Sequence, residues 1–211
     1  MKSIKKSRVE YKKGTLNEND LYDHPVKMFK KWLENALTKV SEPNAFILST
    51  VNQDNAPSSR VLLLRDINDA GFVFFTNYLS QKGRDISENP KVCMNFFWPE
   101  LEQQIRITGH IEKVSETISD DYFQSRPYES RIGAWSSPQS ECIDNRQLLE
   151  NKVSYFTKKY SQQVPRPPHW GGYVVMPNKI EFWQGRANRL HDRILYSKDN
   201  EGSWLINRLA P

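Results

Sequence analysis

The chain carries near its C-terminus the stretch EFWQGRANRLHDR, which spans residues 181 to 193. Three arginines, one histidine and two carboxylates share this stretch with two aromatic residues. If residues 188 to 194 are extended, alternate side chains share a face, so Arg189, His191 and Arg193 project together. Such a face suits a phosphorylated, planar ligand, because a guanidinium pairs with phosphate oxygens and stacks on rings. A solvated, charged edge strand is the alternative that this stretch alone leaves open.

Six further segments support the same interpretation when they are read together with this stretch. They lie in order along the chain: Arg60 to Arg65, Phe75-Thr76-Asn77, Ser80 to Lys82, Tyr122 to Pro127, Ile132-Gly133-Ala134-Trp135 and Gln139-Ser140. Together with the terminal Arg208-Leu209-Ala210-Pro211, the set resembles the pyridoxine (pyridoxamine) 5'-phosphate oxidases, the FMN enzymes that make pyridoxal 5'-phosphate. The resemblance runs from about Arg8 to Pro211.

The resemblance implies a mostly β fold with flanking helices, the antiparallel FMN-binding split β-barrel. Members of the family are homodimers that hold the flavin at the subunit interface, so we expect a homodimer. The chain has no internal repeat and no convincing linker, so we expect a single FMN-binding domain over residues 21–211. Residues 1–20 are rich in lysine and are predicted to form a mobile N-terminal segment.

Length and composition limit the class of protein. A chain of 211 residues with 37% hydrophobic and 12% aromatic residues can bury a substantial core. No apolar run approaches the roughly 18 to 20 residues that a membrane span needs. The basic N-terminus lacks the apolar segment of a secretory signal. We therefore expect a cytoplasmic enzyme that does not associate with a membrane.

Charge and cysteine content argue against two other kinds of binding. The formal net charge is +5, but outside residues 2–13 the basic residues are scattered, and no nucleic-acid-binding module is recognisable. Several phosphate ligands would account for the same charge. Cys93 and Cys142 form no CxxC pair, and no histidines stand at ligand spacing. We therefore expect no nucleic-acid partner and no metal.

Hydrophobic periodicity predicts one helix followed by antiparallel strands. Pro25 opens a helix whose apolar residues recur every three or four positions through Val40. Between Ala45 and Gly109, short β-branched segments separated by turn residues predict hairpins, with a short helix before Pro90. We expect this meander to close into a barrel.

The C-terminal half is predicted to begin with helices and to return to strands. Short helices are expected on either side of Pro127, and a longer helix capped by Asp144 is expected to run to Tyr160. Strands are then predicted at residues 172–176, 179–184, 188–196 and 204–209.

Side chains must hold any phosphate, because the chain has neither a GxGxxG loop nor a Walker A loop. One suitable set comprises Arg60, Thr76, Lys82 and Ser140, and a second comprises Arg65, Tyr122, Arg126 and Ser130. A continuous helix would align Tyr122, Arg126 and Ser130 on one face, but Pro127 interrupts it. We expect these three residues to converge at a helix–turn junction, and a capped helix end with a surface arginine is the alternative.

The resemblance also implies a position for each site residue. The flavin positions are Arg60, Val61, Leu62, Leu63, Leu64, Arg65, Phe75, Thr76, Gln81, Lys82, Gln104, Gln139, Ser140, Trp183 and Arg193. The substrate positions are Arg8, Tyr11, Arg65, Tyr122, Arg126, Ser130, Arg189, Leu190 and His191. Arg60 and Arg65 are five residues apart, so a regular strand would point them to opposite faces. A strand end or a bulge would resolve this difficulty.

The chemistry of the family sets the expected reaction. The flavin accepts a hydride from C4' of pyridoxine or pyridoxamine 5'-phosphate and passes electrons to oxygen, giving pyridoxal 5'-phosphate and hydrogen peroxide. Arg189 and His191 are the catalytic candidates, since they could position the pyridine ring and ease proton loss from the 4' group. For His191, a structural role beside Asp192 is the alternative.

Two positions depart from the residues that are usual in the family. Arg65 stands where lysine is usual, and Gln81 stands where arginine is usual. Arg65 keeps the charge, whereas Gln81 removes a cation near the expected flavin phosphate. We therefore expect weaker FMN binding than a Gln81→Arg variant would show.

Three other functions stay open from the sequence. A flavin reductase or a deazaflavin-dependent reductase could use the same barrel, but it would have no use for Arg189-Leu190-His191 or for the Tyr122, Arg126 and Ser130 set. A non-catalytic carrier would bind pyridoxal 5'-phosphate without consuming oxygen. A nucleic-acid-binding protein would show a strongly salt-dependent affinity for DNA.

Overall fold

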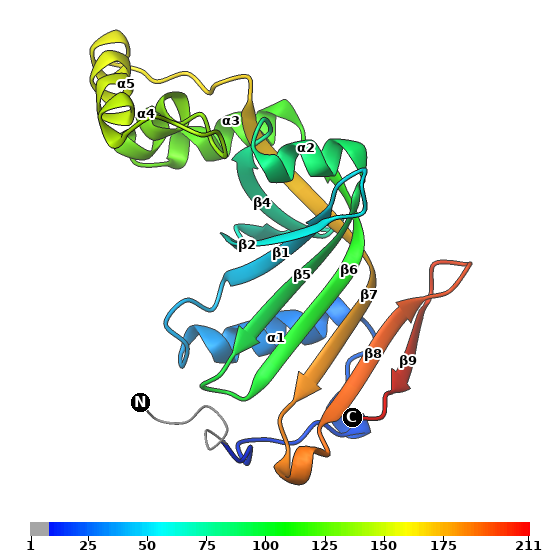
Figure 1. The fold of residues 1–211 in the computed structure, drawn as a ribbon. Helices are drawn as coiled ribbons and strands as arrows, with labels where there is room; N and C mark the ends of the chain where they lie inside the picture. The colour runs from blue at the N-terminus through cyan, green and yellow to red at the C-terminus, as the bar shows by residue number, and fades with distance from the viewer. Residues whose placement is uncertain (1–8) are drawn as a thin grey trace.

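One antiparallel sheet of nine strands carries the fold, and the computed structural model describes it together with the rest of residues 9–211. The strands are β1 (Ala45–Val51), β2 (Pro57–Leu63), β3 (Asp66–Ile67), β4 (Phe72–Asn77), β5 (Lys91–Trp98), β6 (Gln103–Lys113), β7 (Trp170–Gln184), β8 (Asp192–Lys198) and β9 (Trp204–Arg208). Their order is β2-β1-β5-β6-β7-β4-β3, and β8 and β9 extend the sheet from β7. The sheet curves into a half-barrel (Figure 1), which confirms the predicted antiparallel β fold.

Helices flank the sheet at two places. They are α1 (Pro25–Leu37), α2 (Gln81–Glu88), α3 (Glu116–Ser125), α4 (Tyr128–Ser136) and α5 (Arg146–Lys159), together with the 3-10 turns η2 (Glu18–Asp20) and η3 (Ala187–Arg189). In Figure 1, α1 lies along the lower part of the sheet, whereas α3, α4 and α5 gather beyond its upper end. None of the helices between residues 9 and 211 combines the length and apolar character of a membrane span.

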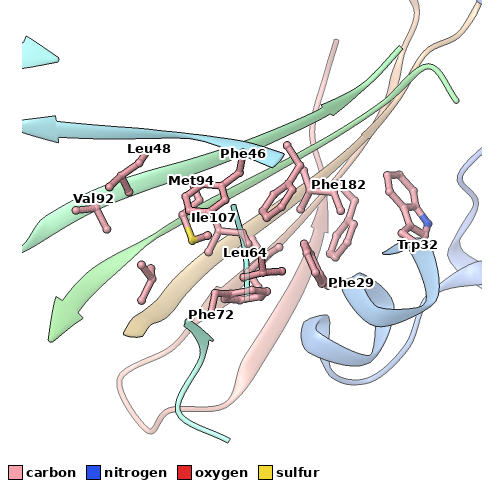
Figure 2. Packing of buried hydrophobic residues seen from close by; sticks show 14 of the residues in the cluster. Phe29, Trp32, Phe46, Leu48, Leu64, Phe72, Val92, Met94, Ile107 and Phe182 are labelled. Carbon is pink, nitrogen blue, oxygen red and sulfur yellow. The ribbon is translucent and has the colours of Figure 1, made fainter. Parts of the chain in front are cut away.

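An aromatic core fills the space between α1 and the sheet (Figure 2). Phe29 is fully buried and meets Phe72 and Phe96 edge-on, with ring centroids 4.9 and 5.1 Å away. Trp32 lies 5.3 Å from Phe182 in the same arrangement. Such edge-to-face pairs add to the stabilisation that comes from burying the rings. The core therefore joins the first helix to strands from both halves of the chain.

Strand β7 runs unbroken for 15 residues, although two separate strands were predicted over this region. The prediction was wrong because the register between β6 and β7 shifts at Thr108 and Gly109, which places Pro177 at an irregularity in the ladder. A bulge accommodates a proline that a regular central strand would exclude. At Gly109, a Cβ would lie 2.1 Å from the carbonyl oxygen of Met176, so only glycine fits there.

The stretch from 188 to 191 is not extended, which corrects the start of the strand predicted over 188–196, because β8 begins at Asp192. Asn188 and Arg189 both have left-handed backbone conformations, with φ of 57° and 63°, so the chain turns through η3 before β8 begins. Two such residues in succession reverse the chain direction and abolish the strict alternation of faces. A smaller correction concerns α5, whose N-cap is Asn145 rather than Asp144.

The described part of the N-terminal segment packs against the end of the sheet where β7 leads into β8. The backbone N–H groups of Lys12 and Lys13 donate to Glu102 Oε2 over 2.7 and 2.8 Å. Leu16 is buried in the core, and its N–H donates to Asp192 Oδ2 over 3.0 Å. These contacts fix the path of residues 12–16, whereas mobility of residues 1–20 in solution and the single domain over 21–211 stay predictions.

Replacing Phe29 with alanine is expected to lower the free energy of unfolding by about 3 to 5 kcal/mol, because it removes a fully buried ring and leaves a cavity. Leu37→Ala on the same helix provides the control, because Leu37 is 62% exposed and should cost much less. Urea unfolding measured by circular dichroism compares the two variants. Equal losses would contradict the assignment of α1's buried face.

Candidate functional site

A cavity of about 490 Å³ lies where β2 and β4 meet the paired helices α3 and α4. Its lining comes from four parts of the chain: Val61, Leu62, Leu63, Arg65, Phe75, Thr76, Asn77, Tyr122, Arg126, Ser130, Gly133, Ala134, Ser137, Gln139 and Trp170. Tyr122 lies on α3, Arg126 caps its C-terminus and Ser130 lies on α4. The structure thus brings these three residues together at the turn between α3 and α4, as the sequence predicted.

A pile of aromatic rings forms one wall of this cavity. Phe75 and Tyr122 stack with centroids 3.8 Å apart, and Trp170 lies parallel to Phe75 at 5.7 Å. The guanidinium of Arg126 lies 4.5 Å from the Trp170 ring, and that of Arg65 lies 5.9 Å from the Tyr122 ring. Cation–π contacts of this kind hold a cation at a defined place while leaving its N–H donors available.

Arg126 is poised for an anion. Within residues 9–211, its buried Nη1 atom has no hydrogen-bond partner. Burial lowers the pKa of Arg126, and the positive charges of Arg65 and Arg131 add to that effect. A buried donor without a hydrogen-bond partner destabilises the fold, and the neighbouring positive charges repel one another. An anionic ligand would relieve both penalties.

Arg166 fixes the start of β7, where Trp170 lies. Arg166 Nε donates to Asp120 Oδ1 over 2.6 Å, its Nη2 bonds Glu116, and its Nη1 donates to the carbonyl oxygen of Trp170 over 2.7 Å. The side chain of Arg166 therefore ties the start of β7 to α3. This attachment holds the Trp170 ring against the Arg126 guanidinium.

A second cavity, of about 380 Å³, continues from the first along β2. It is lined by Ser58, Ser59, Arg60, Val61, Leu62, Gln81, Lys82, Gln139 and Ser140. Val61, Leu62 and Gln139 line both cavities, so the two form one groove. Most of the predicted flavin positions lie along this groove.

Two cations dominate the second cavity. Lys82 Nζ donates to Ser80 Oγ and to Gln139 Oε1, each over 2.9 Å. Burial, followed by repulsion from Arg60, lowers the pKa of Lys82 to about 8. Arg60 is mostly buried, and its guanidinium donates to the hydroxyls of Thr50 and Ser58. An anion between Arg60 and Lys82 would favour the charged form of the lysine.

The chain changes direction between Arg60 and Arg65, which resolves the parity difficulty. Strand β2 ends at Leu63, the Leu64 N–H donates to the carbonyl oxygen of Asn44, and the Arg65 N–H donates to that of Val73. The chain thus passes from pairing with β1 to pairing with β4, and both arginines reach the groove. Leu64 differs from its neighbours in the motif, because its side chain turns into the main core and lines neither cavity, and its flavin position stays a prediction.

The remaining predicted residues gather at the opposite end of the sheet, except for Arg8, which lies outside the described residues 9–211. A cavity of about 630 Å³ there is lined by Val9, Glu10, Tyr11, Arg186, Asn188, Arg189 and His191. Leu190 is 68% exposed beside it. Gln104, Trp183 and Arg193 occupy one cross-strand row on β6, β7 and β8, next to this cavity. Arg193 is already engaged, because its Nε donates to the buried Glu181 over 2.8 Å.

His191 is held in one orientation. Its Nδ1 accepts a hydrogen bond from the backbone N–H of Arg186 over 3.1 Å, and its ring packs 4.6 Å from Trp183 and 5.7 Å from Tyr11. A backbone N–H can only donate, so Nδ1 must be unprotonated and the neutral ring carries its hydrogen on Nε2. Burial, and then the charge of Arg189, lowers the pKa of His191. The neutral ring therefore presents a donor, rather than an acceptor, at Nε2.

The two groups of predicted residues do not meet within one chain. Trp170, which lines the first cavity, and Gln184, which precedes η3, are the two ends of β7. At about 3.3 Å per residue, 15 residues of strand span roughly 45 to 50 Å. Figure 1 shows α3 and α4 at the upper end of β7 and the orange turn that contains η3 at the lower end.

Trp170 is a lining residue that the sequence analysis did not identify. Its signal was the pair of glycines that follows it. At Gly172, a Cβ would lie 2.7 Å from the ring of Phe75, and at Gly171 it would lie 2.2 Å from the hydroxyl of Tyr78. A side chain at Gly172 would displace Phe75 from the aromatic pile, and one at Gly171 would displace the neighbouring Tyr78, so a tryptophan before two glycines at a strand start marks this wall.

Two families match this chain over most of its length. Residues 33–160 match the family described as pyridoxamine 5'-phosphate oxidase, and residues 170–211 match the pyridoxine 5'-phosphate oxidase C-terminal dimerisation region. The pyridoxine/pyridoxamine 5'-phosphate oxidase of Nostoc punctiforme is 51% identical, over 100% of this chain and 99% of its own. That of Actinobacillus succinogenes is also 51% identical, over 97% of each chain.

Solved structures share the fold. PhzG from Burkholderia lata, determined with tetrahydrophenazine-1-carboxylic acid, superposes with a TM-score of 0.87 at 31% identity, covering 93% of this chain and 98% of its own. A pyridoxamine 5'-phosphate oxidase-related, FMN-binding protein from Nostoc punctiforme gives a TM-score of 0.72 at 16% identity, covering 90% and 100%. At that identity the second match shows the fold alone, and it agrees with the predicted split β-barrel.

Nitrogen-15 NMR of the imidazole is expected to show His191 as the Nε2–H tautomer, with a pKa below the ordinary value of 6.5. Because the folded state resists protonation, the stability that His191 contributes is fully present above pH 6.5, the unfolded-state value, and is lost as the pH falls from there through the lower folded-state pKa. His110, exposed on β6, supplies an internal comparison. A proton on Nδ1 in the neutral ring would contradict the assigned hydrogen bond.

Proposed function

The chain belongs to the pyridoxine/pyridoxamine 5'-phosphate oxidase family, and from this membership we propose that it oxidises pyridoxamine or pyridoxine 5'-phosphate to pyridoxal 5'-phosphate. FMN is the cofactor and oxygen is the final electron acceptor, so hydrogen peroxide is the second product. The observation that carries the proposal is the continuous groove along β2, which has a separate cation cluster at each of its two cavities. A phosphorylated flavin and a phosphorylated pyridine side by side would need such a groove.

The second cavity fits the flavin phosphate. Arg60 and Lys82 are both largely buried, and they supply two positive charges to a site that also offers the hydroxyl of Ser140. Gln139 and Thr76 lie where the two cavities join and would bond the ribityl hydroxyls. When bound, FMN supplies the group that accepts a hydride and then reduces oxygen.

The first cavity fits the substrate phosphate. Arg126 offers a buried Nη1 donor without a partner, and Arg65 stands at the mouth of the same cavity. The hydroxyls of Tyr122 and Ser130 complete the set of donors. Charge-assisted hydrogen bonds from arginine to phosphate are both strong and directional, so they would fix the remainder of the substrate against the flavin.

A second copy of the chain would complete the site. Residues Arg189 and His191 lie a full strand length from the groove, so in one chain they cannot touch a ligand bound there. The outer face of the sheet exposes Ile47, Phe97 and Val61, and Val61 is 66% exposed although it lines the groove. Apolar residues in this position favour an interface between two copies. The homodimer that the C-terminal family description names would meet both requirements.

Across this interface, Arg189 and His191 would position the pyridine ring. His191 Nε2–H would donate to an oxygen of the substrate, because Nδ1 is occupied by the Arg186 N–H. Arg189, which is exposed at the turn in η3, would add a cation next to the ring. Tyr11 packs against His191 from the N-terminal segment and would help to exclude water from the site.

The purified, FMN-loaded protein is expected to convert pyridoxine 5'-phosphate to an aldehyde in air, with one hydrogen peroxide formed per aldehyde. Absorbance of pyridoxal 5'-phosphate and a peroxide assay measure the two products. Arg126→Ala should lower kcat/KM strongly, because it removes the buried donor for the substrate phosphate. Lys158→Ala, which removes an exposed cation on α5, serves as the control.

Other outcomes of this assay identify the competing functions. Bound vitamin without oxygen consumption would indicate a carrier. Bound flavin that turns over only other substrates, such as the dihydro form of a tricyclic carboxylate, would indicate another flavin oxidase. Either result would overturn the proposed function.

Trp170→Leu is expected to raise KM for the phosphorylated substrate roughly three- to thirtyfold with little change in kcat, because the ring that holds Arg126 is lost. Trp204→Leu, on β9 and outside the groove, is the matched control. Steady-state kinetics of both variants test this prediction. A fall in kcat alone, with KM unchanged, would show that the ring does not hold the phosphate site.

Gln81→Arg is expected to tighten FMN binding about tenfold, since it restores one charge-assisted contact at the second cavity. Gln147→Arg adds the same charge on the exposed face of α5 and controls for net charge. Equilibrium dialysis gives the dissociation constants. Equal FMN affinity in wild type and Gln81→Arg would contradict the expected effect of this departure.

A further inference from the structure

We propose that Asp85 is a positioning residue for the cofactor site, which aims the guanidinium of Arg60 at the phosphate through the hydroxyls of Thr50 and Ser58. The inference rests on the proposed function, because FMN supplies the phosphate. Asp85 does not line the cavity, so its positioning effect on the phosphate would pass through Arg60.

The strand register brings Arg60, Thr50 and Ser58 together. Thr50 pairs with Ser58 and Leu48 pairs with Arg60 between β1 and β2, so all four side chains lie on the same face of this strand pair. Helix α2 packs over that face and points Asp85 at it. Asp85 is only 5% exposed and Thr50 is fully buried. A carboxylate buried to this extent needs hydrogen-bond donors and a positive partner.

The hydrogen bonds form a relay in which each hydroxyl has one defined role. Thr50 Oγ1 lies 2.6 Å and Ser58 Oγ lies 3.0 Å from Asp85 Oδ2. An ionised carboxylate can only accept, so each hydroxyl spends its single hydrogen on Asp85. The hydroxyl oxygens then accept from Arg60, over 2.7 Å from Nη1 to Thr50 and 2.5 Å from Nη2 to Ser58. The carboxylate thereby sets the direction of both bonds.

This relay occupies one edge of the guanidinium and leaves another edge for a ligand. Nη1 also donates to the carbonyl oxygen of Leu48 over 3.3 Å, so contacts among residues 9–211 use three of the five N–H groups of Arg60. The other two are Nε–H and the second Nη2 hydrogen, which lie side by side. That pair matches two oxygens of one phosphate, whereas a freely rotating Arg60 would not present it consistently.

Asp85 also balances the charge behind the cavity. Burial lowers the pKa of both Arg60 and Lys82, and the carboxylate of Asp85 opposes the effect on each. Its Oδ2 lies 3.8 Å from Arg60 Nη2. The same negative charge would repel a phosphate, so positioning and repulsion make opposite predictions. If positioning dominates, neutralising Asp85 weakens FMN binding, and if repulsion dominates, it tightens FMN binding.

Asp85→Asn distinguishes these two effects when FMN and riboflavin, which differ only in the phosphate, are both titrated by quenching of flavin fluorescence. We expect FMN to bind roughly tenfold more weakly, with riboflavin affinity unchanged. A merely structural role would weaken both ligands by similar factors and would overturn the proposal. Unchanged or tighter FMN binding would overturn it as well. Glu88→Gln removes an exposed carboxylate from the same helix and is the matched control.

Two additional variants test the proposal even if Asp85→Asn does not fold. Ser58→Ala removes one hydroxyl of the relay from a partly exposed position, and it should also weaken FMN selectively. In an Arg60→Met background, Asp85→Asn should have no further effect on FMN affinity, because the group that it positions is gone. Additive losses in the double variant would contradict a role through Arg60. If the wild-type protein binds neither flavin, the proposed function itself fails.

Discussion

The length of strand β7 is the constraint on which the rest of the molecule depends. It runs from the aromatic pile at Trp170 to the buried Gln184 beside η3, and its pairing with β6 and β8 leaves no freedom to bring those ends together. A cavity of a few hundred cubic ångströms at one end cannot share a ligand with a cavity at the other. Chemistry that uses both sets of residues therefore needs two chains.

The arginines of the two cavities are oriented by different physical means. Arg126 lies over the ring of Trp170, which fixes its position and leaves its donors available. Arg60 is held by two hydroxyls in front of a buried carboxylate. At the other end of the sheet, Arg193 pairs directly with buried Glu181, which Arg106 also bonds. A phosphate needs the first two arrangements, because a direct carboxylate partner would occupy the same edge of the guanidinium.

Much of this arrangement was predictable from sequence where local rules decide the outcome. The helix that begins at Pro25, the antiparallel strands and the convergence of Tyr122, Arg126 and Ser130 were predicted, since periodicity and a proline specify them. The path of residues 188 to 191 was predicted wrongly. Left-handed backbone at Asn188 and Arg189 has no glycine to signal it, and it is stabilised by the contact between the Arg186 N–H and His191.

Other features depend on contacts between distant segments and could not be read from spacing. Leu64 looked like a groove residue by its position in a motif, yet the change of partner strand after Leu63 turns it into the core. Trp170 meets Phe75 only because β4 and β7 pair. The separation of Arg189 and His191 from the groove follows from the sheet order, which fixes where each end of β7 lies.

The most direct test of a site shared by two chains is the activity of a purified heterodimer of Arg126→Ala and Arg189→Ala chains, isolated through two different affinity tags. Each homodimer lacks one half of every site and should be inactive. In the heterodimer, one of the two sites keeps both residues, so about half of the wild-type activity per dimer is expected. A heterodimer as inactive as its parents would contradict the shared site.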